Sequence, residues 1–179
     1  NLGNIFRRQE NIEKSIEHYE QAIAINDHPR TRSNLGAALR KQGQIEEAFA
    51  QYDRALELNA DSKNAHFGLG IIYAEQGNWV QALKEYERAI EIDPTYSEVY
   101  LNLGALHMQM QQTELAIEAY EKAIGITPYF AQAHYNLGVA YGKMNKPRQA
   151  MESYERAVQL EPSFVAARIN LGIAYYDRK

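Results

Sequence analysis

The sequence contains no cysteine, so disulfide bridges, thiolate zinc sites and cysteine nucleophiles are all excluded. With 5 prolines and 11 glycines among its 179 residues, the chain also lacks the composition of a linker-rich or low-complexity protein. No apolar run approaches the ~20 residues that a membrane-spanning helix needs. The stability of the fold must therefore come from the packing of its side chains.

Basic residues do not exceed acidic ones: 19 Lys and Arg stand against 23 Asp and Glu, giving a formal net charge of −4. Nucleic-acid binding relies on a basic surface that displaces counterions from phosphates, so this balance speaks against a nucleic-acid partner. The content of 45% hydrophobic and 23% charged residues is that of a globular protein, which excludes a disordered chain. The localisation stays unknown, although the lack of cysteine fits the reducing cytoplasm.

A Leu-Gly pair recurs along the whole chain at nearly constant spacing. The interval is 33 residues once and 34 residues four times, and the pairs are Leu2-Gly3, Leu35-Gly36, Leu69-Gly70, Leu103-Gly104, Leu137-Gly138 and Leu171-Gly172. We number each 34-residue frame so that this Leu is position 7. The chain then consists of a partial frame 1–28, the full frames 29–62, 63–96, 97–130 and 131–164, and a partial frame 165–179, which we interpret as one domain.

Each frame carries two apolar stripes at helical spacing, one at positions 4, 7, 8 and 11 and one at positions 20, 24 and 27. The pattern predicts two amphipathic helices per frame, eleven helices in all, and no strand. Small residues at 8, 20 and 27 let the helix backbones approach closely. Position 24 is a predicted core tyrosine in every frame: Tyr19, Tyr52, Tyr86, Tyr120 and Tyr154.

These residues resemble the tetratricopeptide repeat over essentially the whole chain: Leu-Gly at 7 and 8, an aromatic at 11, Ala at 20 and 27, an aromatic at 24 and Pro at 32. The resemblance implies an all-α superhelical solenoid of antiparallel helix pairs. Leu39 and His107 depart from the aromatic at 11, while Asp27 and Ala60 depart from the Pro. The first junction is one residue short, so we expect an irregular turn near Asp27.

The sequence contains no recognisable arrangement of catalytic residues. We therefore predict that the chain is not an enzyme and that it binds no metal and no cofactor. The five histidines are too far apart in the helical register to share a metal ion. His66 and His134 at position 4, and His107 at position 11, occupy packing positions. The acidic residues of the second helices alternate with Lys and Arg, as on a solvated helix face.

The first-helix stripe comprises positions 2, 5, 6, 9, 12 and 13, which face away from the packing positions on a helical wheel. In this architecture it lines the concave groove. Its N-terminal part is basic, and its central part carries apolar side chains that we expect to be exposed, as partner surfaces are. The predicted peptide-binding residues are Asn4, Arg7, Arg8, Arg30, Asn34, Arg40, Lys41, Phe67, Ile71, Leu101, Asn102, Met108, Tyr135, Asn136, Val139 and Asn170.

Position 6 is asparagine in five of the six frames and is glycine only at Gly68. A carboxamide both donates and accepts hydrogen bonds, so a file of asparagines can hold the backbone of an extended peptide. The file is similar to the asparagine ladder in the repeat domain of the O-linked N-acetylglucosamine transferases.

The predicted function is that of a protein-interaction scaffold whose groove binds an extended segment, both acidic and apolar, of a protein partner. Two alternatives stay open. In the first alternative, the chain is the substrate-recruiting repeat domain of a larger enzyme such as a glycosyltransferase. In the second, it is a structural solenoid that assembles with copies of itself through its terminal helices. Because Asn1 falls within a predicted helix, we expect the natural chain to begin earlier.

Overall fold

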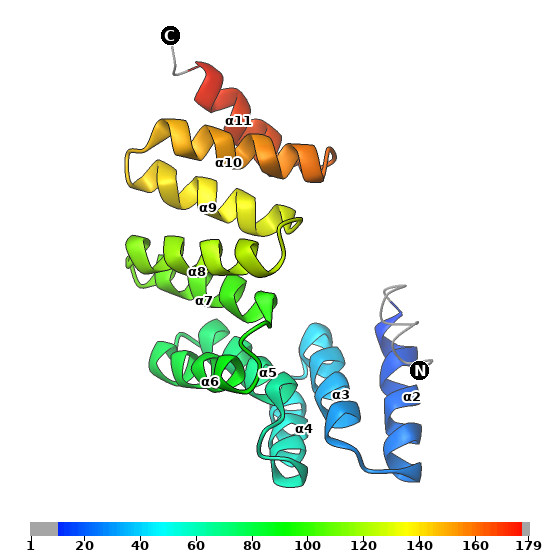
Figure 1. The fold of residues 1–179 in the computed structure, drawn as a ribbon. Helices are drawn as coiled ribbons and strands as arrows, with labels where there is room; N and C mark the ends of the chain where they lie inside the picture. The colour runs from blue at the N-terminus through cyan, green and yellow to red at the C-terminus, as the bar shows by residue number, and fades with distance from the viewer. Residues whose placement is uncertain (1–10, 177–179) are drawn as a thin grey trace. The chain divides into compact units, whose positions relative to one another are not determined.

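The structure is a computed structural model that describes residues 11–176. Within this range it has ten α-helices and no strand, so the predicted all-α fold of antiparallel pairs is confirmed (Figure 1). The predicted first helix lies outside the described residues. The helices are α2 (Ile12–Ile25), α3 (Pro29–Gln42), α4 (Ile45–Leu58), α5 (Lys63–Glu75), α6 (Trp79–Ile92), α7 (Ser97–Gln109), α8 (Thr113–Ile126), α9 (Ala131–Lys143), α10 (Pro147–Leu160) and α11 (Val165–Tyr176).

The turn inside each helix pair depends on one residue at position 15 with a left-handed backbone. Gly43 and Gly77 have φ of 87° and 75°, and Asn145 has φ of 54°. Glycine has no Cβ to clash there, and asparagine is the side chain that tolerates this conformation best. In the α7–α8 turn the same conformation falls on Gln111, at φ of 61°. The first helices α3, α5, α7 and α9 therefore end within one residue of the same point of their frames.

The junction between α2 and α3 is irregular, as expected from its missing residue. The side chain of His28 accepts a hydrogen bond from the backbone N–H of Arg30 and caps α3, and Pro29 is the first residue of that helix. Asp27 accepts hydrogen bonds from the guanidinium groups of Arg32 and Arg54. Side-chain contacts thus replace the proline that follows the second helices α6, α8 and α10.

The described chain forms two compact units, one ending at Pro94 and one beginning at Thr95. In the first unit α2 to α5 enclose a core that includes Tyr19, Tyr52 and Leu69. In the second unit α7 to α11 follow one another in layers, and their core includes Tyr120 and Tyr154 (Figure 1). No described helix has the length and hydropathy of a membrane span.

The tyrosines at position 24 explain the glycines at position 8. Tyr86 is 1% exposed and lies against the backbone of α5, where a Cβ on Gly70 would stand 2.5 Å from its ring. Such a separation is far inside van der Waals contact, so only glycine fits. The alanines at positions 20 and 27, such as Ala82 and Ala89, are fully buried beside the tyrosine.

Ion pairs are distributed unevenly. In the first unit Arg54 pairs with Asp27 and Glu57, and Arg88 pairs with Asp61 and Glu91. Both arginines stand at position 26, and each links its second helix to the turn that precedes its own repeat. Among residues 95–176, by contrast, no acidic and basic side chains lie within ion-pair distance of each other. The arginine of this unit at position 26, Arg156, donates a 3.3 Å hydrogen bond to Gln159 instead.

Candidate functional site

The predicted groove residues lie on the first helix of each pair, on α3, α5, α7, α9 and α11. Asn4, Arg7 and Arg8 fall outside the described residues. The others divide between the two units at residue 94, and each unit carries its own stretch of the stripe. We describe the two stretches separately.

In the first unit one of the predicted groove cations is already neutralised. The Arg40 Nη1 group lies 2.5 Å from Glu75 Oε1, which places an ion pair between α3 and α5. The Nε atom of Arg40 is buried and has no hydrogen-bond partner. Arg30 and Lys41 are exposed, and neither has an ion-pair partner among residues 11–176. The available positive charge of this stretch therefore comes from Arg30 and Lys41 rather than from Arg40.

The apolar side chains of the first-unit stretch are half-buried, so the prediction that they are exposed is wrong. The ring of Phe67 lies 6.1 Å, between centroids, from the buried ring of Tyr86. Ile71, one turn further along α5, is also half-buried. A helical wheel gives the direction of a side chain but not the distance to the helix beside it, and neighbouring helices cover these residues in part.

The same correction applies in the second unit. Leu101, Met108, Tyr135 and Val139 are half-buried and pack against the core around Tyr120 and Tyr154. Each of these side chains on α7 and α9 is exposed only in part, so the helices present a smaller apolar surface than the sequence predicts.

Tyr135 is held between two other rings. Its centroid lies 4.9 Å from that of Phe164 and 5.9 Å from that of Tyr154. Ring pairs at these separations favour a fixed orientation, because the edges and faces of the rings carry opposite partial charges. Tyr135 thus offers a rigid aromatic edge on α9.

Three of the asparagines at position 6 already have partners within the chain. The Asn102 Nδ2 group donates to the carbonyl of Glu98 over 2.8 Å, and Asn136 Oδ1 accepts from Gln132 over 2.9 Å. The Asn170 Nδ2 group donates to the hydroxyl of Tyr135 over 3.4 Å. Asn136 and Asn170 also lie near Tyr120 and Tyr154, the position-24 tyrosines of the preceding repeats, where their side chains partly offset the rise in pKa that burial causes.

This proximity has a structural reason. A buried tyrosine hydroxyl needs a polar neighbour, and the asparagine sixteen residues later lies beside it. Gly68 stands at the equivalent position for Tyr52, where a Cβ would lie 2.2 Å from the ring. The Tyr52 ring therefore requires glycine at 68. The asparagine file contributes to the repeat seams, and its role as a peptide ladder stays a prediction, as does the likeness to the transferases.

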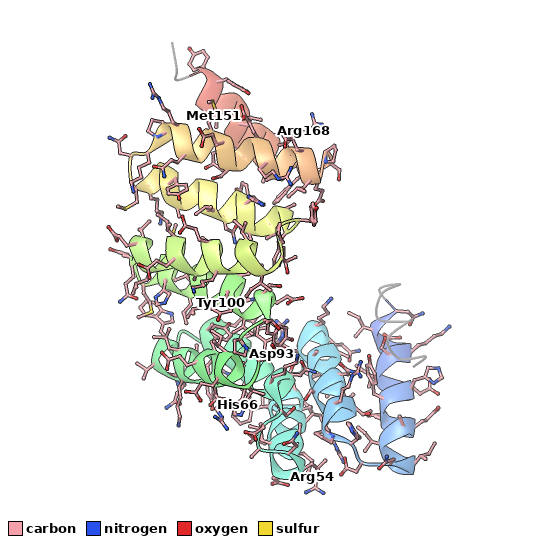
Figure 2. All side chains as sticks on the ribbon, viewed as in Figure 1. Arg54, His66, Asp93, Tyr100, Met151 and Arg168 are labelled. Atoms are coloured by element: carbon pink, nitrogen blue, oxygen red, sulfur yellow. The ribbon has the colours of Figure 1, made fainter. Side chains whose placement is uncertain are left out.

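The second unit contains a pocket of about 670 Å³ that the sequence did not predict. It lies between the α9–α10 turn and α11, and Met151, which lines it, is on α10 beside α11 (Figure 2). Among the predicted peptide-binding residues that the structure describes, Asn170 alone lies on its wall. The other lining residues are Gly142, Asn145, Pro147, Arg148, Ala150, Met151, Tyr154, Ile173 and Ala174. A signal for it was present in the sequence, because position 12 is Met108 in the preceding frame but Gly142 here.

Two histidines at position 4 have opposite environments. His66 on α5 (Figure 2) has Nδ1 at 2.6 Å from Glu85 Oε2 and Nε2 at 3.0 Å from the carbonyl of Ala60. Burial works against the charged ring, but the two acceptors outweigh it and raise the pKa of His66. Burial lowers the pKa of His134, and a carbonyl from Pro128 only partly opposes this effect. Both rings are bound to backbone at the turn before their helix, as packing residues are.

Among residues 11–176, no group of three or more His, Cys, Asp or Glu side chains is arranged to hold a metal ion. Tyr141 at position 11 donates a 2.8 Å hydrogen bond to Glu121, and burial together with this carboxylate raises its pKa to about 12. A tyrosine with a raised pKa is a poor general base at neutral pH.

Family models described as tetratricopeptide repeat match residues 1–61, 33–97, 85–118 and 131–164, and one described as TPR repeat matches residues 106–145. Together these matches span the chain up to residue 164. A comparison with curated proteins gives no significant match.

Solved structures share the fold. MamA is 25% identical with a TM-score of 0.71, and the match covers 90% of this chain and 95% of that one. The TPR protein YrrB, described as having an unusual peptide-binding site, is 19% identical with a TM-score of 0.67, over 93% of this chain and 87% of that one. The Cut9–Hcn1 hetero-tetramer of the APC/C matches at 16% identity with a TM-score of 0.89, over 96% of this chain and 35% of that one.

Proposed function

We propose that this chain, which belongs to the tetratricopeptide-repeat family, is a protein-interaction scaffold that binds an extended peptide segment of a partner along its first helices. Proteins built from this repeat are interaction scaffolds. Its similarity to YrrB, described with a peptide-binding site, and to Cut9 in complex with Hcn1 supports a polypeptide partner.

The observation that carries the proposal is the chemical character of the first-helix stripe in the second unit. Leu101, Met108 and Val139 leave part of their apolar surface exposed beside the rigid ring of Tyr135. Asn102 and Asn136 stand between them with hydrogen-bonding capacity left over, since a carboxamide has two N–H donors and an acceptor with two lone pairs. An extended peptide needs both kinds of contact.

The first unit contributes charge. Arg30 and Lys41 are exposed cations at the two ends of α3. In this proposal they attract acidic residues of the partner, and each such contact is weak because water and salt screen it. The apolar contacts of the second unit supply most of the affinity. The chain acts by binding and not by catalysis.

Hydrogen–deuterium exchange tests the proposal without a mutation. A peptide enriched on the whole chain from a display library of random 12-residue sequences serves as the probe. We expect it to protect amides of the first helices α7 and α9, and to leave the second helix α8 unchanged. Protection confined to α8 would mean that the partner binds the opposite side of the helix layer.

Self-association is a second candidate, favoured by the face of α11. Val165, Ile169, Ile173 and Tyr176 are 66%, 57%, 54% and 76% exposed. Sedimentation over a wide concentration range separates the two candidates. A reversible increase in mass that Ile169→Asp abolishes would support assembly, whereas a constant monomer mass would reject it.

A further inference from the structure

The pocket of the second unit has the size of a ligand site. Its volume of about 670 Å³ falls within the ~300–1,000 Å³ typical of binding pockets. The described chain offers this space within one compact unit, between the end of α9, the start of α10 and the C-terminal half of α11. It is larger than one buried side chain needs, so it accommodates an anchor residue together with part of its neighbours.

The pocket results from a missing side chain. Position 12 of the preceding frame is Met108, which is half-buried against the core of the same unit. At the equivalent position Gly142 has no side chain, and a Cβ placed there would meet only the hydroxyl of Tyr154, at an ordinary 3.8 Å. Nothing in the fold therefore requires glycine at 142. The backbone φ of Gly142 is not positive, which removes the other usual reason for this residue.

The pocket is lined by apolar side chains together with a few polar groups. Met151, Ile173 and Ala174 supply apolar surface, and Tyr154 and Asn170 supply a hydroxyl and a carboxamide. Arg148 lines the pocket from the first turn of α10, is exposed, and pairs with no acidic side chain among the described residues. No Asp or Glu lines the pocket, although the chain as a whole is acidic.

We propose that this pocket is an anchor site that takes an aliphatic or aromatic side chain of the partner peptide, with an adjacent Asp or Glu of that peptide paired to Arg148. The inference rests on the function proposed above and specifies where the peptide is fixed. Three lining residues, Asn170, Ile173 and Gly142, occupy stripe positions 6, 9 and 12. A chain that follows the stripe therefore reaches the pocket, which favours a peptide over a free small molecule.

The substitution Gly142→Met tests the pocket by filling it with the side chain that the preceding repeat already uses. Replacing a helical glycine removes a backbone penalty, so the variant should be at least as stable as the parent chain in thermal unfolding. Peptides enriched on the parent from a random 12-residue display library are the probe. We expect them to contain a large apolar residue beside Asp or Glu, and to bind Gly142→Met about 30-fold more weakly.

The matched control is Gly125→Met. Gly125 lies in α8 of the same unit, is exposed, and has no atom within 4 Å of the position its Cβ would take. The same substitution there should leave peptide affinity unchanged. The charge contribution is measured with Arg148→Gln, which should weaken binding by no more than about 5-fold and only at low salt.

Methyl NMR of the four methionines gives a second readout on the full chain. A bound peptide should shift the Met151 methyl resonance strongly and leave that of Met110 unchanged. If enriched peptides bind Gly142→Met as tightly as the parent and leave Met151 unshifted, the anchor site is wrong while the scaffold function stands. If no peptide is enriched at all, both proposals fail. If decanoate shifts the Met151 methyl resonance and no enriched peptide shifts it, the pocket is a small-molecule site and the inference is overturned.

Discussion

The two units use the same repeat but different chemistry at equivalent positions. His66 in the first unit contacts Glu85, whereas His134 in the second, at the same position 4, has Ser153 in place of that glutamate. The first unit ties its turns to its second helices with ion pairs, and the described second unit has none. The second unit instead has a pocket where the preceding repeat has a methionine. The repeat fixes the backbone, and the variable positions decide between charge and apolar binding surface.

The largest expected difference between the units is in how alanine at a glycine position changes the free energy of unfolding. Gly68→Ala in the first unit forces a methyl group into the ring of Tyr52, which is 2% exposed, and should destabilise the fold by about 1–3 kcal/mol. Gly142→Ala in the second unit makes only an ordinary contact with the hydroxyl of Tyr154 and should stabilise the fold by ~0.5–1 kcal/mol. Urea unfolding measures both. Gly125→Ala is the control and should behave like Gly142→Ala; a tolerated alanine at 68 would contradict the account.

The next prediction separates the two histidines by pH. The raised pKa of His66 means that its stabilising contribution is complete below about pH 6.5 and is lost as the pH rises through the raised value. The lowered pKa of His134 means the reverse: its contribution is present above about pH 6.5 and is lost as the pH falls through the lowered value. Ring-proton NMR should give midpoints on opposite sides of 6.5.

The substitution Glu85→Gln tests whether the contact with Glu85 causes the raised pKa of His66. The side chains of His66 and Glu85 are 12% and 16% exposed, so Glu85→Gln should cost about 1–2 kcal/mol at pH 6 and less at pH 8. The titration midpoint of His66 should fall, while that of His134 stays in place. An unchanged midpoint for His66 would show that the carboxylate does not set its pKa.

The smallest effect is expected from the exposed ion pairs. Arg88→Ala removes the contacts to Asp61 and Glu91 and should lower the urea midpoint of unfolding only slightly. High salt screens such contacts, so the difference should vanish in about 1 M NaCl. Arg156→Ala, at the same position of the second unit, has no ion pair to lose and should show no salt dependence. A loss for Arg88→Ala that persists in high salt would point to packing rather than charge.

The helices were predictable because each follows from local pattern. Periodicity at positions 4, 7, 8 and 11 defined the first helices. This feature acts over one or two turns of chain, so it can be recognised without knowing the neighbours. The left-handed turn at Gln111 carries no such signal, because glutamine does not favour this conformation, and the geometry there is set by the helix pair that it joins.

The candidate site was predictable only in part, because surface exposure depends on helices far away in sequence. The Arg40–Glu75 ion pair spans 35 residues, and no local pattern distinguishes it from a free cation. Tyr135 is covered by Phe164, which lies in the turn after the following helix. The pocket required knowing both that Gly142 lacks a side chain and where α11 lies.

The most direct test of the central claim compares the two units in binding. A peptide enriched on the whole chain is titrated at low and high salt against Tyr135→Ala, against Arg30→Ala with Lys41→Ala, and against Tyr129→Ala as a control outside the stripe, with folding checked by circular dichroism. We predict that Tyr135→Ala loses about 2 kcal/mol of binding free energy at both salt concentrations. The double charge variant should lose less, and only at low salt. If the charge variant dominates and Tyr135→Ala binds like the parent, the partner is not held by the first helices of the second unit.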